Sequence, residues 1–310
     1  MTNLLNKFKI FFIACYLLLS TFLFSQGKDL GTPYDGTKTY IEVLPGNMPL
    51  VISIPHGGYL LPDEIPERPC TDCAKHPDIF TIEIGLAIRN SIFKKTGYYP
   101  YVIINNLHRT RLDPNRNVSE AAQGNKNAEL AWTAFQGSID SANSQVKKKF
   151  GKGLYIDLHG HRHDIKRTEL GYLLSSEELQ MEDDLLNSES FIEYSSIRHL
   201  ITANEFKRSY ADLVRGKFSL GSLLESKGYP CVPSPAHPFP KTDEPYFSGG
   251  YNTTRHGSST GGTIDGIQIE LDEMIRSDSK KRDQLAIDLA SVLVDYLKIY
   301  YFAEFNFGAH

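Results

Sequence analysis

The sequence has no cluster of basic residues and no long block of either charge. Its 310 residues include 33 lysines and arginines against 37 aspartates and glutamates. A nucleic-acid-binding surface needs clustered cations that displace counterions from phosphates, so the even distribution argues against a nucleic-acid partner. Internal repeats and low-complexity tracts are also missing, which leaves the composition of an ordinary globular protein.

Cysteine is scarce as well. Only four cysteines occur, namely Cys15, Cys70, Cys73 and Cys231. A zinc knuckle would need a second cysteine pair in addition to Cys70 and Cys73, and the sequence has none. We therefore expect the segment CTDC at 70–73 to form a local disulfide in an oxidising compartment, or to remain as free thiols, rather than to bind a metal.

The first 26 residues differ from the rest of the chain. Lys7 and Lys9 precede an apolar run, IFFIACYLLLSTFLF, which Ser25 follows. A cationic start, an apolar segment of this length and a small residue at its end are typical of a secretory signal peptide. An uncleaved membrane anchor is the alternative. We expect cleavage near Ser25, a single mature domain over 27–310, and a secreted or periplasmic protein that does not bind the membrane after cleavage.

Predicted strands and helices alternate through most of the chain. Strands are expected at 50–54, 98–106, 153–163 and 264–271, with helices at about 77–95, 125–150 and 279–300. Strands separated by helices form βαβ units, so we predict an α/β fold with a mainly parallel or mixed sheet flanked by helices. A polar region up to about residue 228 has a weaker pattern. Residues 232–262 resemble a long loop rich in proline and glycine, a type that usually carries function.

Two of the predicted strands end in histidine. LVISIPHGG places His56 at the end of the first strand, and YIDLHGH places His159 at the end of another, with Asp157 on the same face. Open α/β sheets bind ligands at the carboxyl ends of their strands. Two histidines, one carboxylate and an open position form a catalytic zinc site. The carboxylate should come from DIFTIEIG, which offers Asp78 and Glu83, and we favour Glu83 because its neighbours are apolar.

Two further polar clusters follow predicted strands. HRTRLDPNR at 108–116 contains three arginines, and guanidinium groups bind carboxylates in a bidentate manner, so this loop is a candidate substrate clamp. In GIQIELDE, Gln268, Glu270 and Asp272 alternate with apolar residues and share one side of a strand. Glu270 would serve as the general base of a zinc-dependent hydrolase. Each cluster taken alone could instead be an exposed polar loop or the solvent-facing side of an edge strand.

Together these segments resemble the N-formylglutamate amidohydrolase family, which is related to the zinc carboxypeptidases and aspartoacylases. The matching pieces are IPHGG, DIFTIEIG, HRTRLDPNR, DLHGH and GIQIEL, in this order. The resemblance implies a carboxypeptidase-like fold and one zinc ion per chain, bound by His56, His159 and a carboxylate from the helix between them. The carboxypeptidase pattern His-x-x-Glu is absent, because Gly57, Gly58 and Tyr59 follow His56.

The resemblance also suggests roles for substrate-binding residues. It implies that Asn115 and Arg116 hold a substrate carboxylate, that Arg109 matches a second family arginine, and that Glu270 is the general base. Apart from the resemblance, His161 or Arg111 is a further candidate, as a stabiliser of the oxyanion. Arg255, in the long loop, is expected to close over the substrate.

We therefore expect a zinc-dependent hydrolase that cleaves an amide bond in an N-formyl or N-acyl amino acid, or in a similar small substrate with a carboxylate. One alternative is a secreted zinc carboxypeptidase that acts on peptides or cell-wall fragments. A second alternative, from another class, is a non-catalytic protein that binds an anionic ligand through its arginines.

Overall fold

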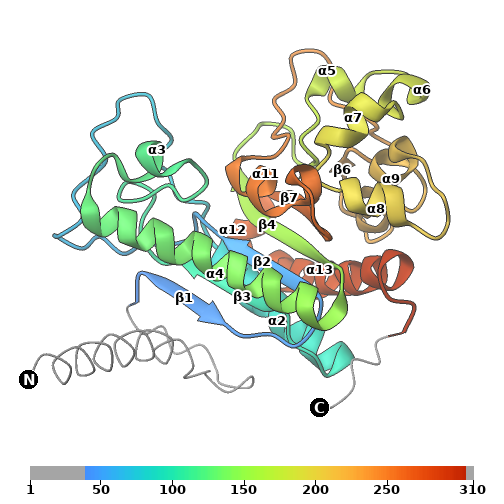
Figure 1. The fold of residues 1–310 in the computed structure, drawn as a ribbon. Helices are drawn as coiled ribbons and strands as arrows, with labels where there is room; N and C mark the ends of the chain where they lie inside the picture. The colour runs from blue at the N-terminus through green and yellow to red at the C-terminus, as the bar shows by residue number, and fades with distance from the viewer. Residues whose placement is uncertain (1–38, 305–310) are drawn as a thin grey trace, which may run out of the picture. The chain divides into compact units, whose positions relative to one another are not determined.

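The described part of the chain is built on a seven-stranded sheet. The structure is a computed structural model, and it describes residues 39–304 (Figure 1). The strands are β1 (Ile41–Leu44), β2 (Leu50–Ile54), β3 (Tyr101–Asn105), β4 (Gly153–His161), β5 (Thr168–Gly171), β6 (Cys231–Val232) and β7 (Ile264–Asp272). Their order in the sheet is β1-β3-β2-β4-β7-β5-β6.

The centre of this sheet is parallel and its flanks are mixed. β3, β2, β4 and β7 run parallel to one another, whereas β1 is antiparallel to β3 and β5 is antiparallel to β7. β6 pairs in parallel with β5. The prediction of an α/β fold with a mixed sheet is therefore confirmed. Because the four central strands are parallel, their carboxyl ends lie at one edge, where ligands bind in such sheets.

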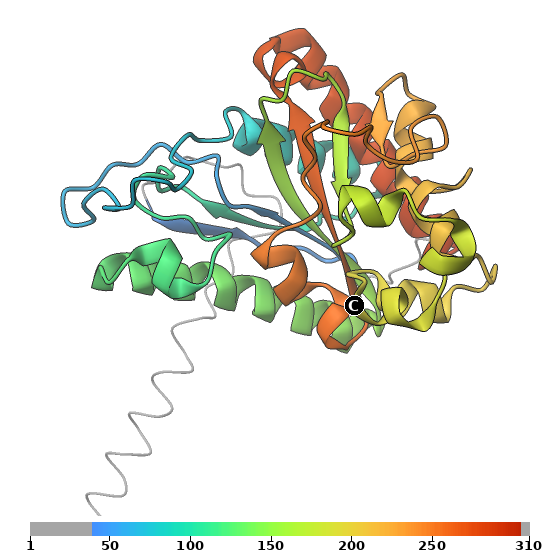
Figure 2. The ribbon, with the colours of Figure 1, turned by 90° about the horizontal axis from the view of Figure 1, so that it is seen from above.

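Helices cover both faces of the sheet, and Figure 2 shows the sheet between α4 and α13. The helices are α2 (Thr81–Thr96), α3 (Val118–Ala122), α4 (Lys126–Phe150), α5 (Ser176–Leu179), α6 (Asp183–Leu186), α7 (Glu189–Tyr194), α8 (Arg198–Ala203), α9 (Tyr210–Arg215), α10 (Leu220–Glu225), α11 (Tyr251–His256), the 3-10 helix η1 (Ser258–Thr260), α12 (Glu273–Ser277) and α13 (Ser279–Tyr300). The predicted helices at 125–150 and 279–300 correspond to α4 and α13.

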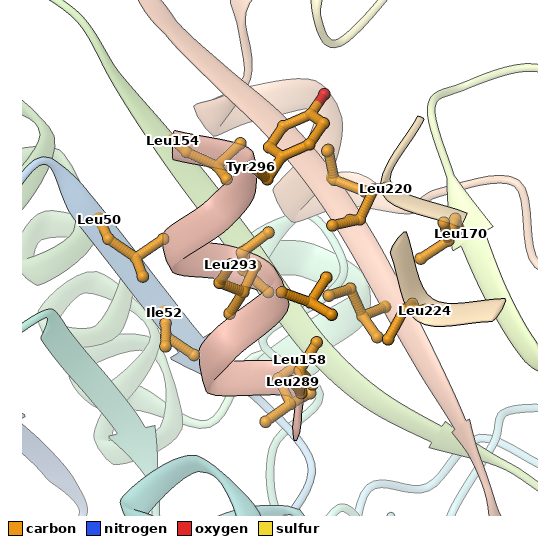
Figure 3. Close-up of a cluster of buried hydrophobic side chains, with 14 of the residues drawn as sticks. Leu50, Ile52, Leu154, Leu158, Leu170, Leu220, Leu224, Leu289, Leu293 and Tyr296 are labelled. Atoms are coloured by element: carbon orange, nitrogen blue, oxygen red, sulfur yellow. The ribbon is translucent and has the colours of Figure 1, made fainter. Parts of the chain in front are cut away.

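Alternation along the central strands divides the core between the two faces. Leu50 and Ile52 of β2 belong to the large cluster that includes α2 and α13, whereas Val51 packs with residues of α4. Figure 3 shows Leu289 and Leu293 of α13 beside the strands of this large cluster. Each such leucine or isoleucine, once fully buried, contributes about 1.5–3 kcal/mol. Burial on both faces explains why these strands are continuous apolar runs in the sequence.

The helix after β2 starts later than the sequence predicts. We expected it to begin near Pro77, but α2 begins at Thr81, because Phe80 adopts a left-handed conformation with φ 64° and ends the preceding loop. Gly97 caps its C-terminus in the left-handed region, as glycine does most readily. As a consequence, Asp78 lies in the loop before the helix rather than on its first turn.

The two weakly patterned regions contain short helices. The polar region expected after β5 forms α5 to α10, each of four to six residues, and the expected loop at 232–262 contains α11 and η1. Helices this short show less than two turns of periodicity, so their apolar spacing is not visible in the sequence. Their caps are visible, because Ser175 and Glu178 form a capping box at the start of α5.

Two glycines after β2 allow the chain to turn closely against its neighbours. A Cβ atom on Gly58 would lie 2.2 Å from the carbonyl carbon of Asn106, and one on Gly57 would lie 2.6 Å from the side chain of Thr81. Any larger residue would push these segments apart. The glycines therefore hold His56 at the end of β2, next to the loop that precedes α2.

The cysteines and the predicted signal peptide are the remaining features on which the sequence raised expectations. Cys70 and Cys73 are joined by a disulfide, as one of the two expected states requires, and Cys231 is a buried free thiol. The predicted signal peptide lies outside the described residues. Among residues 39–304, no helix has both the length and the apolar character needed to cross a membrane.

Candidate metal centre and active site

Three buried side chains meet at the carboxyl ends of β2 and β4. Nδ1 of His56 lies 3.3 Å from Oδ2 of Asp78, and Nδ1 of His159 lies 3.2 Å from the same oxygen. The three side chains each offer a ligand atom, and these atoms lie within 4.8 Å of one another. Two imidazole nitrogens and one carboxylate oxygen could hold a metal ion, and this donor set suits zinc.

Backbone contacts fix Asp78 between the two histidines. Its amide donates a hydrogen bond to the carbonyl of His56 at 2.9 Å, and its own carbonyl accepts one from Oγ1 of Thr81 at 2.8 Å. The amide of Gly160 donates to Oδ2 of Asp78 at 3.2 Å. The backbone of Asp78 is therefore tied to the end of β2 and to the first residue of α2, and its carboxylate is tied to β4.

Glu83, which we favoured as the third ligand, does not belong to this group. α2 buries Ile84 and Ile88 against the sheet, and Glu83 lies on its exposed side. The apolar neighbours that made Glu83 conspicuous in the sequence therefore mark the buried face of the helix rather than a polar site within it. The structure supports the alternative that the sequence left open, Asp78.

Each histidine is also held from the opposite side of its ring. Nε2 of His56 lies 2.7 Å from Oδ1 of Asp113, and Nε2 of His159 lies 2.8 Å from Oδ2 of Asp157. Carboxylates in these positions fix the tautomer and the orientation of a metal-binding imidazole. Asp157 was expected beside His159, whereas the contact of Asp113 with His56 was not predicted from the sequence.

Glu270 comes to the site because β7 pairs with β4 in a particular register. His159 and Glu270 are paired residues of these two parallel strands, and Oε1 of Glu270 lies 4.0 Å from Nδ1 of His159. Gln268, on the same side of β7, donates a hydrogen bond to Oε1 of Glu270 at 3.0 Å. Two members of the expected polar row, Gln268 and Glu270, therefore face the candidate metal centre, whereas Asp272 caps α12.

Burial and the surrounding charges set the ionisation of the carboxylates. Burial raises the pKa of Glu270 to about 8, and Asp78 adds to the rise, while His159 opposes it. Burial also raises the pKa of Asp78, but the charge of His56 and the hydrogen bond of His159 outweigh it, so the net pKa of Asp78 is lowered. A carboxyl that shares a buried site with another carboxylate releases its proton reluctantly unless a cation is present.

The polar atoms of this site fit a bound cation. Four buried carboxylates surround the two imidazoles, namely those of Asp78, Asp113, Asp157 and Glu270. Burial lowers the pKa of His159, but Asp157 outweighs it, so the net pKa of His159 is raised well above 6.5. Arg109 pairs with Asp78 and Asp113, and a divalent cation held by His56, Asp78 and His159 would compensate the buried negative charge that remains.

A cavity of about 150 Å³ opens beside the three metal-ligand candidates. Arg109, Asn115 and Arg116 from the loop after β3 line it, together with Gln268 and Glu270. Arg109 is held by Asp113, because its Nε donates to Oδ2 of that residue at 3.0 Å. The three residues expected to bind a substrate carboxylate are thus brought to the same cavity as the expected ligands and base.

His161 and Arg255 are not brought to this cavity. Nε2 of His161 lies 2.8 Å from the carbonyl of Arg167, and its Nδ1 accepts a hydrogen bond from the amide of His163. Arg255 lies on α11 and pairs with Asp140 of α4 at 2.8 Å. Neither residue lines the cavity in this structure, because each is engaged elsewhere, and their contact with a substrate stays a prediction.

A second group, His161, His163 and Glu169, also has ligand atoms within 4.8 Å of one another. Oε1 of Glu169 lies 2.9 Å from Nδ1 of His163, and both ring nitrogens of His161 already have partners in the backbone. These hydrogen bonds account for the close approach of the three side chains.

Residues that were not singled out in the sequence complete the site. Phe247, Gly249 and Gly250 line the cavity from the long loop. Asn252 is fully buried, and its backbone N–H donates a hydrogen bond to Oδ1 of Asn115 at 2.9 Å. The only signal in the sequence was the length of the loop, which indicated function without naming a residue.

Known proteins resemble this chain in structure but not in sequence. No protein-family model matches the sequence, and no curated protein matches it. The structure is similar to that of an N-formylglutamate amidohydrolase from Ralstonia eutropha JMP134, with a TM-score of 0.54 and 12% identity over 85% of this chain and 99% of that chain. The gene product Atu2144 from Agrobacterium tumefaciens has a TM-score of 0.48 and 11% identity, over 84% of this chain and 94% of that chain. At such identities the likeness concerns the fold, and this chain has the α/β fold of the Ralstonia protein.

Proposed function

We propose that this protein is a zinc-dependent hydrolase that cleaves the amide bond of an N-formyl or N-acyl amino acid, or of a similar small substrate with a carboxylate. The observation that carries the proposal is the pairing of His159 with Glu270 across β4 and β7. This pairing puts a carboxylate of raised pKa beside a two-histidine, one-aspartate group in a cavity lined by arginines.

His56, Asp78 and His159 would hold the zinc ion, with Asp113 and Asp157 orienting the histidine rings. Bound zinc supplies electrostatic activation of the scissile carbonyl and of the attacking water.

Glu270 would act as the general base and then as the general acid. It accepts the proton of the attacking water and passes it to the leaving nitrogen, so that the C–N bond breaks and an acid and a free amine are released. Gln268 keeps the carboxylate in place through its hydrogen bond to Oε1. A base whose pKa lies near neutrality suits both proton transfers.

Arg116 and Asn115 would hold the carboxylate of the substrate. Arg116 is exposed at the mouth of the cavity, and Nη1 also donates to the carbonyl of Asn115 at 2.8 Å. Arg109 lies deeper and is paired with Asp113 and Asp78, so it would stabilise negative charge that develops near the carbonyl oxygen.

The test is hydrolysis by the zinc-loaded protein. We would measure formate and acetate release from N-formylglutamate and N-acetylglutamate, with Glu270→Gln as the variant. Loss of a general base costs about 10²–10⁴-fold in rate, so Glu270→Gln should lose activity by this factor while it keeps its zinc. Release of acid that is equal in both proteins would contradict the assigned role of Glu270.

The alternative of a carboxypeptidase keeps the same residues and differs in its products. It predicts release of a C-terminal amino acid from peptides rather than release of an acyl acid. If no substrate is turned over with zinc bound, and if Glu270→Gln binds anionic ligands as tightly as the wild type, the non-catalytic binding protein is the better description. The apolar segment within residues 1–26 is the basis on which we place the reaction outside the cytoplasm.

A further inference from the structure

A second, larger cavity adjoins the candidate active site. Its volume is about 450 Å³, against about 150 Å³ for the cavity at the metal-ligand candidates. Arg116 lines both cavities, and Asp113, which contacts His56, lines the larger one. A substrate held by Arg116 would therefore have this space directly beyond it.

The outer wall of the second cavity is a small closed loop over residues 67–75. Three contacts close it, namely the disulfide between Cys70 and Cys73, the hydrogen bond from Nη2 of Arg68 to the carbonyl of Ala74 at 2.6 Å, and the ion pair of Glu67 with Lys75 at 2.8 Å. A loop cross-linked in this way loses little entropy when it binds a ligand. The wall is thus built before any ligand arrives.

Arg68 also ties this loop to the arginine loop of the active site. Its Nε donates to the carbonyl of Arg109 at 3.0 Å, and its backbone amide donates to the carbonyl of Thr110 at 2.8 Å. The residue is 3% exposed and lines the cavity, and its Nη1 donates no hydrogen bond within residues 39–304. A buried guanidinium with a free donor in a cavity is a site for an anionic group.

The geometry points to a second subsite, which binds the part of the leaving group that continues past Arg116. This inference rests on the proposed function and narrows its substrate to a peptide-like molecule whose leaving portion is a dipeptide or longer and ends in a carboxylate. Arg68 would receive that carboxylate. The exposed carboxylates of Asp72 and Glu120, which also line the cavity, suit the peptide N–H groups of such a chain.

The test compares two substrates that differ by one added glutamate residue at the leaving end. Formate release is measured from N-formylalanine and from N-formylalanyl-glutamate by the zinc-loaded full chain. The second substrate should have a kcat/KM at least about tenfold higher, because a charge-assisted hydrogen bond contributes about 1.5–3 kcal/mol. Equal kcat/KM values for the two substrates would overturn the inference.

Two variants fill the cavity from its outer wall and change no residue of the active site. Ala74→Trp and Thr71→Trp both start from exposed positions in its wall. Each variant should lower kcat/KM for N-formylalanyl-glutamate to the value for N-formylalanine, and it should leave kcat/KM for N-formylalanine unchanged. Thr260→Trp, from an exposed position in the wall of a different cavity, is the matched control and should change neither. If Ala74→Trp and Thr71→Trp lower kcat/KM equally for both substrates, or lower it for neither, the subsite does not exist.

Failure of the proposed function is recognised separately. If neither substrate releases formate, the hydrolase proposal fails, and calorimetric binding of the dipeptide alanyl-glutamate decides about the subsite. Binding that is about tenfold weaker in Ala74→Trp than in the wild type supports the subsite. Equal binding in the two proteins overturns it.

Discussion

Oδ1 of Asp113 lies 2.7 Å from Nε2 of His56, on the side of the imidazole ring opposite to Asp78. The two residues come from loops after different strands, 57 positions apart. This contact leaves Nδ1 of His56 as the ring nitrogen that faces the other two metal-ligand candidates. It also pairs Asp113 with Arg109, so one carboxylate orients both a ligand and a cationic side chain of the cavity.

We predict that Asp113→Asn weakens metal binding. An asparagine can present its amide N–H groups to Nε2 of His56, which favours the tautomer with a proton on Nδ1, the nitrogen needed for the metal. Loss of such an orienting carboxylate typically costs 10–100-fold in metal affinity, so zinc affinity should fall by about this factor. Competition with a chelator gives the affinity. Asp283→Asn, at an exposed position on α13, is the matched control and should bind zinc as the wild type does.

A second prediction separates Asp78 from Glu83. Zinc content of the purified protein should be about one per chain in the wild type and in Glu83→Ala, and it should be lost in Asp78→Ala, as in His56→Ala and His159→Ala. Asp78 is buried between the histidines, whereas Glu83 is exposed on α2. Zinc retained in Asp78→Ala and absent in Glu83→Ala would reverse the assignment made from the structure.

A third prediction distinguishes two arginines that the sequence made equal candidates. Arg116→Ala should raise KM for N-formylglutamate by about 10–100-fold, because a guanidinium contact to a carboxylate contributes about 1.5–3 kcal/mol. Arg255→Ala should leave KM unchanged, because Arg255 pairs with Asp140 outside the cavity. Steady-state kinetics on both variants make the comparison. A raised KM in Arg255→Ala alone would mean that α11 moves into the site when substrate binds.

The fourth prediction concerns pH and stability. Burial lowers the pKa of His256 below its usual 6.5, and Asp140 opposes the shift only in part. As pH falls, His256 is therefore protonated near pH 6.5 in the unfolded chain, but only at a lower pH in the folded protein. Between these two pH values the free energy of unfolding decreases as pH falls, by at most about 1.4 kcal/mol per pH unit for this one group.

Denaturant unfolding of the wild type and of His256→Gln from pH 8 to pH 5 measures this contribution. The glutamine variant should lose stability less steeply on acidification, whatever its stability at pH 8. His76→Gln changes an exposed histidine and should keep the slope of the wild type. An unchanged slope in His256→Gln would show that His256 accepts its proton as readily in the folded protein as in the unfolded chain.

The parts of the fold that the sequence predicted well are those with long periodic signals. α13 spans Ser279–Tyr300, as expected, and β2 spans Leu50–Ile54, because both combine many apolar residues with clear ends. The start of α2 was missed because a single residue, Phe80, adopts a left-handed conformation that its type does not favour. Local patterns carry no information about such an exception.

The candidate site was predictable where its residues follow strands, and not where tertiary contacts decide. His56, His159 and Glu270 could be placed because parallel strands end at one edge of a sheet. The position of Asp78 depended on a backbone hydrogen bond to His56, and the position of Arg255 outside the cavity depended on an ion pair with Asp140, 115 positions earlier in the chain. Neither contact has a signature in the sequence.

The register of β4 against β7 limits which changes in chain length the protein can tolerate. Side chains alternate between the two faces of a strand, so one residue inserted before Glu270 within β7 would turn this carboxylate to the opposite face of the sheet. A one-residue deletion between Gly153 and His159 would do the same to the histidine. Variation in length among natural or engineered relatives should therefore fall outside these two strands, in segments such as α5 to α10 that no residue of the metal centre occupies.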